Sequence, residues 1–449
     1  MSKVIKIKKG LNIKLKGQAE KVFFKTEPSD RYAVKPIDFP GLIPKMLVKE
    51  GDSVKAGTAL FMDKNRPELL FASPVSGTVE AVVRGEKRRI LEVTVKADGM
   101  NAAEDFSKAK PTNLNKEAIT EYLLAGGVWP FIRQRPYAII ANPQDTPKSI
   151  FISCFDSAPL APDYDFIFQD YNPDFQEGVD ALAKLTSGKV HLSIHSDFSP
   201  ASPFRKINNV EIHEFSGPHP SGNVGVHIHH INPVNKGDNV WCVNPQDVLA
   251  IGRLMSKAVY DVSKTIVLCG SEVSSPCYFQ LTGGCQISAF SNHIKEGDVR
   301  YISGNVLTGT QIAPDGYLGF YDSQITVIPE GNHSELFGWA LPGLGKYSAG
   351  RTFLSWLTPD REYRLDTNLH GGRRALVMTG EYDKVFPMDI YPEHLVKAIL
   401  AGDIEKMENL GIYEVAEEDF ALCEFVCTSK TDVQSIIRDG INLMIKEMN

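Results

Sequence analysis

The sequence predicts a multidomain protein of mixed α/β and α+β class, and three observations support this. The chain has 449 residues, more than one ordinary hydrophobic core accommodates, so we expect several domains. Strand and helix patterns alternate through its middle part, which is typical of a mostly parallel sheet. The last segment, from about Arg374, shows the apolar periodicity of helices.

Short strands and tight turns are predicted for the first hundred residues. The segment Pro40–Phe61 carries turns at Glu50–Asp52 and Ala56–Gly57. The segment Phe71–Val83 repeats this device, with Ser76–Gly77 before an alternating strand. The two segments resemble the halves of a biotinyl/lipoyl-like hammerhead.

Such hammerhead domains can carry a cofactor on a lysine at the tip of a hairpin. Here the usual position falls near Arg66, and Lys64 lies two residues out of register. Arginine cannot form the amide bond to biotin or lipoate, so we expect the fold without the carrier function.

The middle of the chain predicts alternating helices and strands. A helix places Ile119, Tyr122 and Leu123 on one face and ends at Gly126–Gly127. A short buried strand follows in residues 137–143. Further on come a strand within 149–166, a helix in 175–188 and a strand in 189–197, which together predict a mostly parallel sheet.

Two other patterns follow along the chain. Residues 265–332 read as short strands around a Gly-Gly turn, which fits a small β-grasp-like domain. Residues 391–411 and 430–448 show helical periodicity, and one apolar stripe consists of Leu395, Ala398, Ile399 and Ile404.

These patterns predict four domains. The predicted domains are a biotinyl/lipoyl-like hammerhead β domain at 1–103, a Rossmann-like α/β domain at 116–256, a β-grasp domain like the SLBB domain at 257–335, and a helical domain resembling a degenerate iron–sulfur domain at 374–449. Residues 104–115 read as a linker between the first two.

Composition restricts the function. A net charge of −7 and a pI of about 5.9 argue against nucleic acid as the main partner. Seven cysteines, an odd number in a long chain, indicate reduced thiols in the cytoplasm. The first residues carry no signal peptide, and no apolar run approaches the ~20 residues of a membrane helix. We therefore expect membrane contact only through partners.

Histidines crowd into one short segment. The chain has 11, and this segment holds His213, His219, His227, His229 and His230. The β-branched stretch 224–234 predicts a strand, on which His227 and His229 share one face and His230 takes the other. A zinc site would need His213 or His219 as a third ligand. Without an H-E-x-x-H or C-x-x-C motif, we expect hydrogen-bonded histidines at a domain interface and no metal.

Two tail segments resemble ferredoxin-type motifs that have lost their ligands. The iron–sulfur pattern is C-x₂-C-x₂-C-x₃-C-P. The later segment keeps Cys423 and Cys427 but replaces the other positions with Glu417, Phe420 and Thr428. The earlier segment holds Leu376, Thr379, Tyr382 and Phe386, followed by Pro387. We expect apolar side chains to fill the cluster volumes, with Cys423 and Cys427 as buried core residues.

Together these features resemble the A subunit of the Na⁺-translocating NADH:quinone oxidoreductase across essentially the whole chain. The resemblance is carried by IKIKKGLNIKLKG at 5–17, GPHPSGNVGVHIHHINPV at 217–234, RYISGNVLTGTQ at 300–311 and EDFALCEFVCTSK at 418–430. More distant kin are the C subunit of the Rnf electron-transport complex and the NADH-binding flavoprotein subunit of respiratory complex I.

The resemblance also bears on cofactors. The distant kin bind flavin and NADH on a loop of roughly G-R-G-G-x-G-F-P, whose bare backbone N–H groups approach a phosphate. The corresponding stretch here is Ala125–Pro136, which keeps Gly126–Gly127 and Pro130–Phe131 but is crowded by Val128 and Trp129. We expect no tightly bound cofactor. The resemblance places FAD, FMN and iron–sulfur centres in partner subunits.

A quinone, ubiquinone or menaquinone, is the one ligand the resemblance suggests for this chain. A quinone site needs an apolar slot for the ring and donors for two carbonyl oxygens. The candidate contacts are Trp129, Phe131, Arg133 and Arg135, with Tyr32 and Phe39 from the N-terminal domain. The same side chains could equally be core or subunit interface.

The resemblance implies a peripheral subunit on the cytoplasmic face of the bacterial inner membrane. Its complex passes electrons from NADH to quinone and exports Na⁺, and this chain contacts mainly membrane subunits. The alternative is a pure scaffold subunit with no quinone site. A third reading, a zinc- or biotin-dependent soluble enzyme, rests only on the histidines and the hammerhead.

Overall fold

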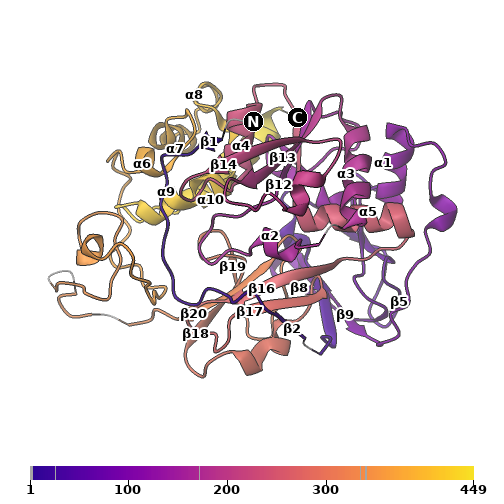
Figure 1. Cartoon of the computed structure of the whole chain (residues 1–449), viewed down its shortest axis with the longest axis horizontal. Coiled ribbons are helices and arrows are strands. Elements are labelled where there is room, and N and C mark those ends of the chain that lie inside the picture. Colours follow the sequence, from indigo (N-terminus) through magenta and orange to yellow (C-terminus); the bar gives the residue numbers. More distant parts are fainter. Residues whose placement is uncertain (1–3, 26, 171, 334, 339–340, 449) are drawn as a thin grey trace.

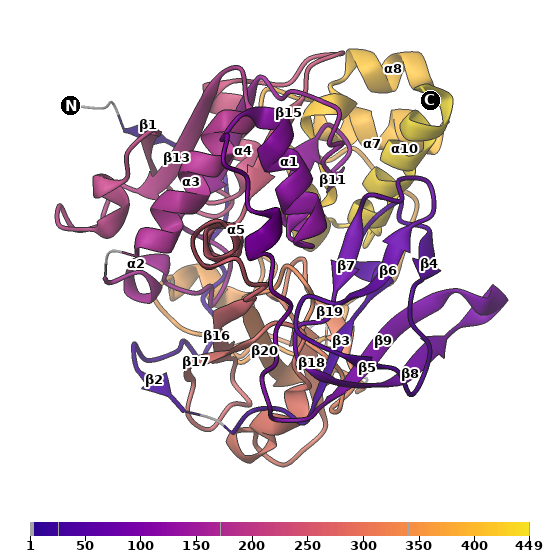
Figure 2. The same cartoon turned by 90° about the vertical axis from the view of Figure 1, so that its right-hand side faces the viewer.

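The computed structural model describes residues 4–448 except 26, 171, 334 and 339–340. Two small antiparallel sheets, a seven-stranded sheet, a six-stranded sheet and a group of C-terminal helices pack together (Figures 1 and 2). No helix of the described chain is long and apolar enough to cross a membrane.

The two N-terminal sheets are wholly antiparallel. One has the order β3 (Arg31–Val34), β9 (Ile90–Ala97), β8 (Gly77–Arg84), β5 (Ser53–Val54), and the other β4 (Pro44–Met46), β6 (Ala59–Asp63), β7 (Leu70–Ala72). The predicted alternating strand is confirmed in β8, where Gly77 and Val79 are buried while Thr78 and Glu80 are exposed. Alternation of this kind buries one face of a sheet and leaves the other to water.

The tip of the β6–β7 hairpin is attached to the neighbouring domain. Arg66, at the position where a carrier domain has its lysine, donates to Asp63 Oδ2 at 3.2 Å and to the Ile140 carbonyl at 3.3 Å. Lys64 is exposed. A carrier hairpin has to move freely between sites, and this one is held in place.

The seven-stranded sheet is mostly parallel, as the sequence predicts. Its order is β1 (Ile5–Lys6), β14 (Glu211–Ser216), β13 (Lys189–His195), β12 (Ser149–Ser153), β15 (Val240–Val243), β10 (Arg133–Arg135), β11 (Ile139–Ile140). The pairs from β1 to β15 are parallel, and β10 and β11 are antiparallel additions at one edge.

Helices cover both faces of this sheet. The outer layer, turned toward the viewer in Figure 2, contains α1 (Lys116–Ala125), α2 (Tyr164–Ile167), α3 (Pro173–Leu185) and α5 (Pro245–Lys257). Ile150 and Ile152 of β12 share a core with α3 and α5, whereas Phe151 packs with Ile228 of α4 (Val224–Ile231). Because successive strand side chains alternate, α4 lies on the opposite face.

Two expectations for the helices around this sheet have opposite outcomes. Helix α1 is confirmed, with Ile119, Tyr122 and Leu123 buried. The predicted strand at 224–234 is wrong, because Val224–Ile231 is helix α4. Val224, Ile228 and Ile231 pack into one small core at helical spacing, which outweighs the strand preference of β-branched residues. The expected split of the histidines between two strand faces therefore fails as well.

The six-stranded sheet is mixed. Its order is β19 (Thr310–Ile312), β18 (Val299–Ser303), β20 (Gln324–Pro329), β16 (Ser263–Cys269), β17 (Cys277–Thr282), β2 (Phe23–Phe24). The predicted Gly-Gly turn is confirmed after β17, and Gly284 adopts a φ of +76°. A Cβ on Gly284 would lie 2.4 Å from the Ala33 carbonyl oxygen, so only glycine allows this approach to the N-terminal domain.

The tail is helical, as predicted. It contains α6 (Tyr382–Val385), α7 (Pro392–Leu400), α8 (Ile404–Asn409), α9 (Ala421–Val426) and α10 (Val433–Met448). The predicted stripe faces the core, with Leu395, Ala398 and Ile399 buried and Ile404 partly buried against them.

Apolar side chains fill the space between the two degenerate cluster segments. Cys423 and Cys427 are buried core residues, as expected. The ring of Phe386 packs 4.8 Å from that of Phe420, and the Tyr382 hydroxyl donates to Cys427 Sγ at 3.0 Å. The core of this helical domain therefore depends on side-chain packing.

The N-terminal segment connects three parts of the molecule. β1 adds to the edge of the seven-stranded sheet, and β2 adds to the edge of the six-stranded sheet. Between them Leu15 forms a bridge with Tyr363, just before the helical tail. Figure 1 shows this segment, in indigo, running along the outside of the molecule.

Candidate functional site

The loop after α1 positions four of the six candidate quinone contacts. Gly127 has a φ of +71°, and a Cβ on Gly126 would lie 2.3 Å from the Leu254 side chain. The positive φ of Gly127 favours glycine, and a side chain at Gly126 would have to displace Leu254. A 3₁₀ turn at Trp129–Phe131 follows and leads into β10. Val128 and Trp129 are fully buried, so side chains fill the loop as the sequence predicts.

Trp129 is a structural residue of this loop. Its Nε1 donates to the Ala141 carbonyl at 2.9 Å, and its ring meets Trp241 edge to face at 5.5 Å. A buried tryptophan with a satisfied donor stabilises its own loop. Trp129 cannot stack on a ligand without leaving these contacts.

Aromatic rings from three predicted domains meet beside the loop. We call this cluster the aromatic junction, and it consists of Phe39, Phe71, Phe131, Phe320 and Tyr321. Phe131 stacks on Phe320 with a centroid distance of 4.6 Å and an interplanar angle of 19°. Phe39 lies 4.8 Å from the same ring. Phe39 and Phe131, both predicted from the sequence, thus contact the same ring, Phe320, which was not predicted.

Phe320 and Tyr321 were not predicted from the sequence. They lie in the loop before β20, in the stretch GYLGFYD. Two adjacent aromatic residues in a connecting segment are the one sequence feature that could have marked them as functional candidates. Both are only half-buried, unlike Phe39 and Phe131. The half-buried Asp38 accepts from the Phe320 backbone N–H at 2.9 Å and so fixes the loop against the N-terminal domain.

Arg133 lies against the junction. Its guanidinium is 4.7 Å from the centroid of the Tyr321 ring, and its Nη2 donates to Asn244 Oδ1 at 3.3 Å. Its Nε is buried without a hydrogen-bond partner. Burial raises the pKa of Tyr321 well above its ordinary value, so its hydroxyl stays protonated and donates to the Pro130 carbonyl at 2.7 Å.

Arg135 lies outside the aromatic junction and forms ion pairs with the helical tail. Its Nη2 donates to Glu418 Oε1 at 2.6 Å and its Nη1 to Asp419 Oδ2 at 3.1 Å. The side chains of Arg135 and Asp419 are almost completely buried. This arginine joins the seven-stranded sheet to the helical tail.

Tyr32 also lies apart from the junction. It packs in the core of the six-stranded sheet, where it bridges Cys285. Burial raises its pKa to about 12. Of the six candidates, the structure groups Phe39, Phe131 and Arg133 and places the others in separate contacts.

The histidine-rich segment forms interfaces. His227 is fully buried on α4 and contacts the Ser221 carbonyl through Nε2 at 2.8 Å. His229 bridges to the helical tail, with Nδ1 at 2.9 Å from Glu414 and Nε2 accepting from the Asp389 N–H at 3.0 Å. The histidines of α4 thus have separate partners.

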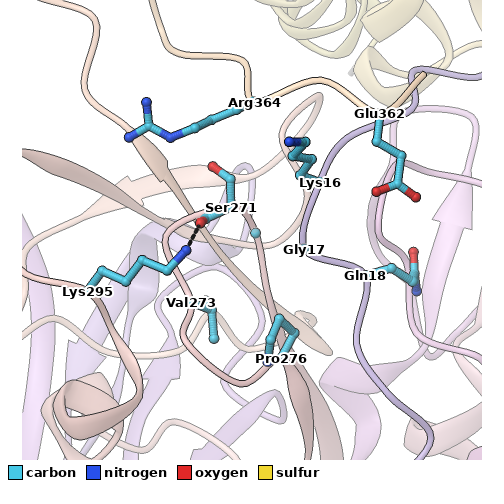
Figure 3. A pocket seen from close by; sticks show the side chains of 10 residues that line it. Lys16, Gly17, Gln18, Ser271, Val273, Pro276, Lys295, Glu362 and Arg364 are labelled. Atoms are coloured by element: carbon cyan, nitrogen blue, oxygen red, sulfur yellow. Dashed lines mark hydrogen bonds between the residues drawn. The ribbon is translucent and has the colours of Figure 1, made fainter.

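A cavity of about 550 Å³ lies between the N-terminal segment and the six-stranded sheet (Figure 3). Lys16, Lys295 and Arg364 are among the residues that line it. Lys295 donates to the Ser271 carbonyl at 2.6 Å, and Arg364 pairs with Glu272 at 2.7 Å. None of the predicted quinone contacts lines this cavity.

Comparison with known proteins identifies the family. The A subunit of the Na⁺-translocating NADH-quinone reductase of Yersinia pestis bv. Antiqua (strain Angola) is 38% identical over 450 residues, covering 99% of this chain and 100% of the relative. The chain belongs to this A-subunit family. The Pasteurella multocida (strain Pm70) member is 39% identical over 449 residues, with coverage of 99% and 100%.

Family domains match in the same order. The N-terminal barrel-sandwich hybrid domain of this family matches residues 5–98, the second alpha/beta domain 114–260 and the C-terminal domain 265–313. Among solved structures, an NAD⁺-reducing [NiFe]-hydrogenase aligns with 75% of this chain and 62% of the hydrogenase chain, at 11% sequence identity. Its TM-score of 0.38 is too low to show a shared fold.

Proposed function

We propose that this chain is the peripheral A subunit of a sodium-pumping NADH:quinone oxidoreductase and contributes to quinone reduction coupled to Na⁺ export. Relatives of that name align with it over their full lengths at 38% and 39% identity. In this proposal the chain carries no redox centre, and FAD, FMN and iron–sulfur centres belong to partner subunits. Its place is the cytoplasmic face of the bacterial inner membrane.

The aromatic junction supports quinone contact. A quinone ring is flat and apolar, and its carbonyl oxygens accept hydrogen bonds, so it suits stacked phenyl rings beside a donor. Phe39 and Phe131 flank Phe320, and Arg133 has an Nε donor without a partner. We assign ring contact to Phe39 and Phe131 and hydrogen bonding to Arg133.

The other three candidates have supporting roles in this proposal. Trp129 holds the loop through Ala141, and Arg135 anchors β10 to the helical tail. Tyr32 anchors the N-terminal sheet against the six-stranded sheet. These residues keep the junction in register and need not touch the quinone.

Entry of a quinone ring requires Phe320 and Tyr321 to move. The junction is packed, and these two half-buried rings lie in a loop whereas Phe39 and Phe131 are buried. Displacing Phe320 would expose the face of Phe131 that it now covers at 4.6 Å. A partner that covers the opened site would exclude water and strengthen the binding.

The test is the double variant Phe131→Ala with Arg133→Ala in the assembled enzyme. Loss of one stacking contact and one hydrogen bond from a charged donor should weaken quinone affinity about 30- to 2000-fold. The matched control is Phe198→Ala with Arg205→Ala, a half-buried pair in the same domain but outside the junction. Unchanged quinone affinity and inhibitor sensitivity in an intact complex would exclude the junction.

A pure scaffold remains the second candidate. It is favoured by the close packing of the junction and by Arg135, which shows that conspicuous side chains of this loop serve domain contacts. The same double variant separates the two. A scaffold predicts weakened assembly with unchanged quinone kinetics in the complexes that do form.

Docking on membrane subunits is assigned to the described residues of the segment, 336–338 and 341–378. Ten of the twenty exposed large apolar residues in the described chain lie here: Leu336, Phe337, Leu341, Leu344, Leu354, Trp356, Leu357, Leu369, Val377 and Met378. Exposed apolar residues gathered in this way mark interaction sites. Leu344→Ser with Trp356→Ser should reduce co-purification with the membrane subunits, whereas Leu400→Ser should not. Equal co-purification of both variants would contradict this assignment.

The finer fold descriptions belong to the same proposal. We describe the seven-stranded sheet as Rossmann-like, the six-stranded sheet as β-grasp of the SLBB kind and the tail as a degenerate iron–sulfur domain. The boundaries 1–103, 116–256, 257–335 and 374–449 stay predictions. Expression of residues 1–103 and 374–449 as separate fragments would test whether each folds alone.

A further inference from the structure

Neighbouring strands β13 and β14 place three ligand-type side chains on one face of the sheet. The parallel register pairs His191 with Glu211 and Ser193 with His213. Register partners share a face, and so do residues two apart on a strand. His191, Glu211 and His213 therefore project together, although 22 residues separate the two histidines in the sequence.

The distances among these side chains suit one small cation. His191 Nδ1 lies 3.0 Å from His213 Nε2 and 3.8 Å from Glu211 Oε2. One potential ligand atom from each residue lies within 4.8 Å of the other two. Zinc bonds of about 2.0–2.2 Å in tetrahedral geometry separate ligand atoms by roughly 3.3–3.5 Å, so small side-chain adjustments bring all three onto one ion.

We propose that His191, Glu211 and His213 bind a divalent transition metal ion of the zinc class, with water as the fourth ligand. The donor set of two imidazoles and one carboxylate is one that zinc accepts in proteins. This proposal is independent of the quinone site. It departs from the sequence-based expectation of no metal, which considered only histidines 213–230 and omitted His191.

The chemistry of the two imidazoles supports metal binding. Burial lowers the pKa of His191 to about 4, and burial also lowers the pKa of His213. Both rings are therefore neutral near pH 7 and have a lone pair to offer. Lys189 holds the pKa of Glu211 below its ordinary value through a 3.0 Å hydrogen bond, so the carboxylate is ionised.

Access and surroundings are also suitable. Glu211 is exposed and gives an ion a route from solvent, while His191 is buried. Ser193 lies opposite His213 on the same face of the sheet, and its buried Oγ has no hydrogen-bond partner. A metal-bound water offers that hydroxyl a partner, which an empty site does not. Lys189 competes for Glu211 and has to release one carboxylate oxygen.

Other histidines of the described chain lie near carboxylates, such as His333 and His370 beside Asp366, but they do not form a second three-ligand group. All seven cysteines are buried, and His227 and His229 contact Ser221 and Glu414. An ion added to the folded chain therefore has one prepared three-ligand site among the described residues. Bound there, it links β13 to β14 and should raise the thermal stability of the seven-stranded sheet.

The experiment titrates Zn²⁺ into the purified full chain after EDTA dialysis, followed by calorimetry and metal analysis. We expect saturable binding near one ion per chain, a raised Tm and, with Co²⁺, visible absorption bands of a tetrahedral site. His191→Gln, His213→Gln and the exposed Glu211→Gln should each weaken binding about tenfold or more. His195→Gln, on the same strand outside the trio, is the matched control.

Two results would overturn the proposal. One is metal content far below one ion per chain at saturating Zn²⁺. The other is binding that persists unchanged in the folded His191→Gln and Glu211→Gln variants, because the ion would then occupy other histidines. Circular dichroism establishes that each variant is folded. Neither result bears on quinone binding or on assembly of the complex.

Discussion

Arg135 shows how burial decides what a side chain can do. The sequence predicts it as a quinone donor because an arginine beside two aromatic residues suits a carbonyl ligand. In the fold its charge is balanced by Glu418 and Asp419, almost 300 residues away along the chain. Sequence spacing carries no information about such a pairing. The sequence therefore shows that an arginine stands here but does not show which groups it contacts.

Removal of the Arg135 guanidinium should strongly destabilise the protein. Arg135→Ala leaves the buried Asp419 carboxylate without its partner, which should cost about 3–5 kcal/mol of unfolding free energy. Urea unfolding measures the loss, and Lys406→Ala at an exposed ion pair should leave the midpoint unchanged. Combining Arg135→Ala with Asp419→Leu should recover part of the loss. If the double variant loses as much stability as the two single variants added together, the unpaired buried charge is not the cause.

Among the secondary-structure elements, helix α4 is the one whose type the sequence pattern predicted wrongly. The apolar residues of 224–231 satisfy both a strand preference and the helical spacing of Val224, Ile228 and Ile231. Local propensity favours the strand, but packing against β12 and the tail selects the helix. By contrast α1, β8 and the tail helices have one clear periodicity each, and the sequence predicts them correctly.

The contact between α4 and the tail depends on a glycine. A Cβ at Gly225 would lie 2.3 Å from Asp419 Oδ1, so Gly225→Ala must displace the carboxylate that pairs with Arg135. We expect a loss of about 1–3 kcal/mol, as for overpacking of a core, and faster proteolysis of the tail. Gly345→Ala is the control because no atom lies within 4 Å of its Cβ position. Equal stability of both variants would show that α4 and the tail separate readily.

At the scale of the molecule, the order of the fold types along the chain was predictable and the contacts between them were not. Alternation of patterns predicts the mostly parallel sheet, and family matches at 5–98, 114–260 and 265–313 follow the predicted order. The edge strands β1 and β2 are two residues each and carry no detectable period. The junction likewise depends on the contact of Phe320 with Phe39 and Phe131, which lie far away in the sequence. Contacts between domains are therefore the part that only the structure supplies.

The whole molecule should lose stability in mild acid. Burial lowers the pKa of His219 to about 4 and of His227 to about 3, against 6.5 in the unfolded chain. Between these values the unfolded state binds protons that the folded state does not, so stability falls as the pH falls below about 6.5. Each histidine contributes up to about 1.4 kcal/mol per pH unit. Buried Asp247, with its pKa raised to about 6, acts in the opposite direction.

A comparison of variants isolates the histidine contribution. Thermal unfolding in EDTA from pH 7.5 to 4.5 should show a steep decline in Tm for the natural chain. His227→Gln removes one buried imidazole that must stay neutral, so its decline should be shallower even if its Tm at pH 7.5 is lower. His394→Gln, at an exposed position, should keep the natural slope. The same slope in all three proteins would mean that acid acts through ion-pair carboxylates whose pKa is lowered in the fold, such as Glu272 beside Arg364.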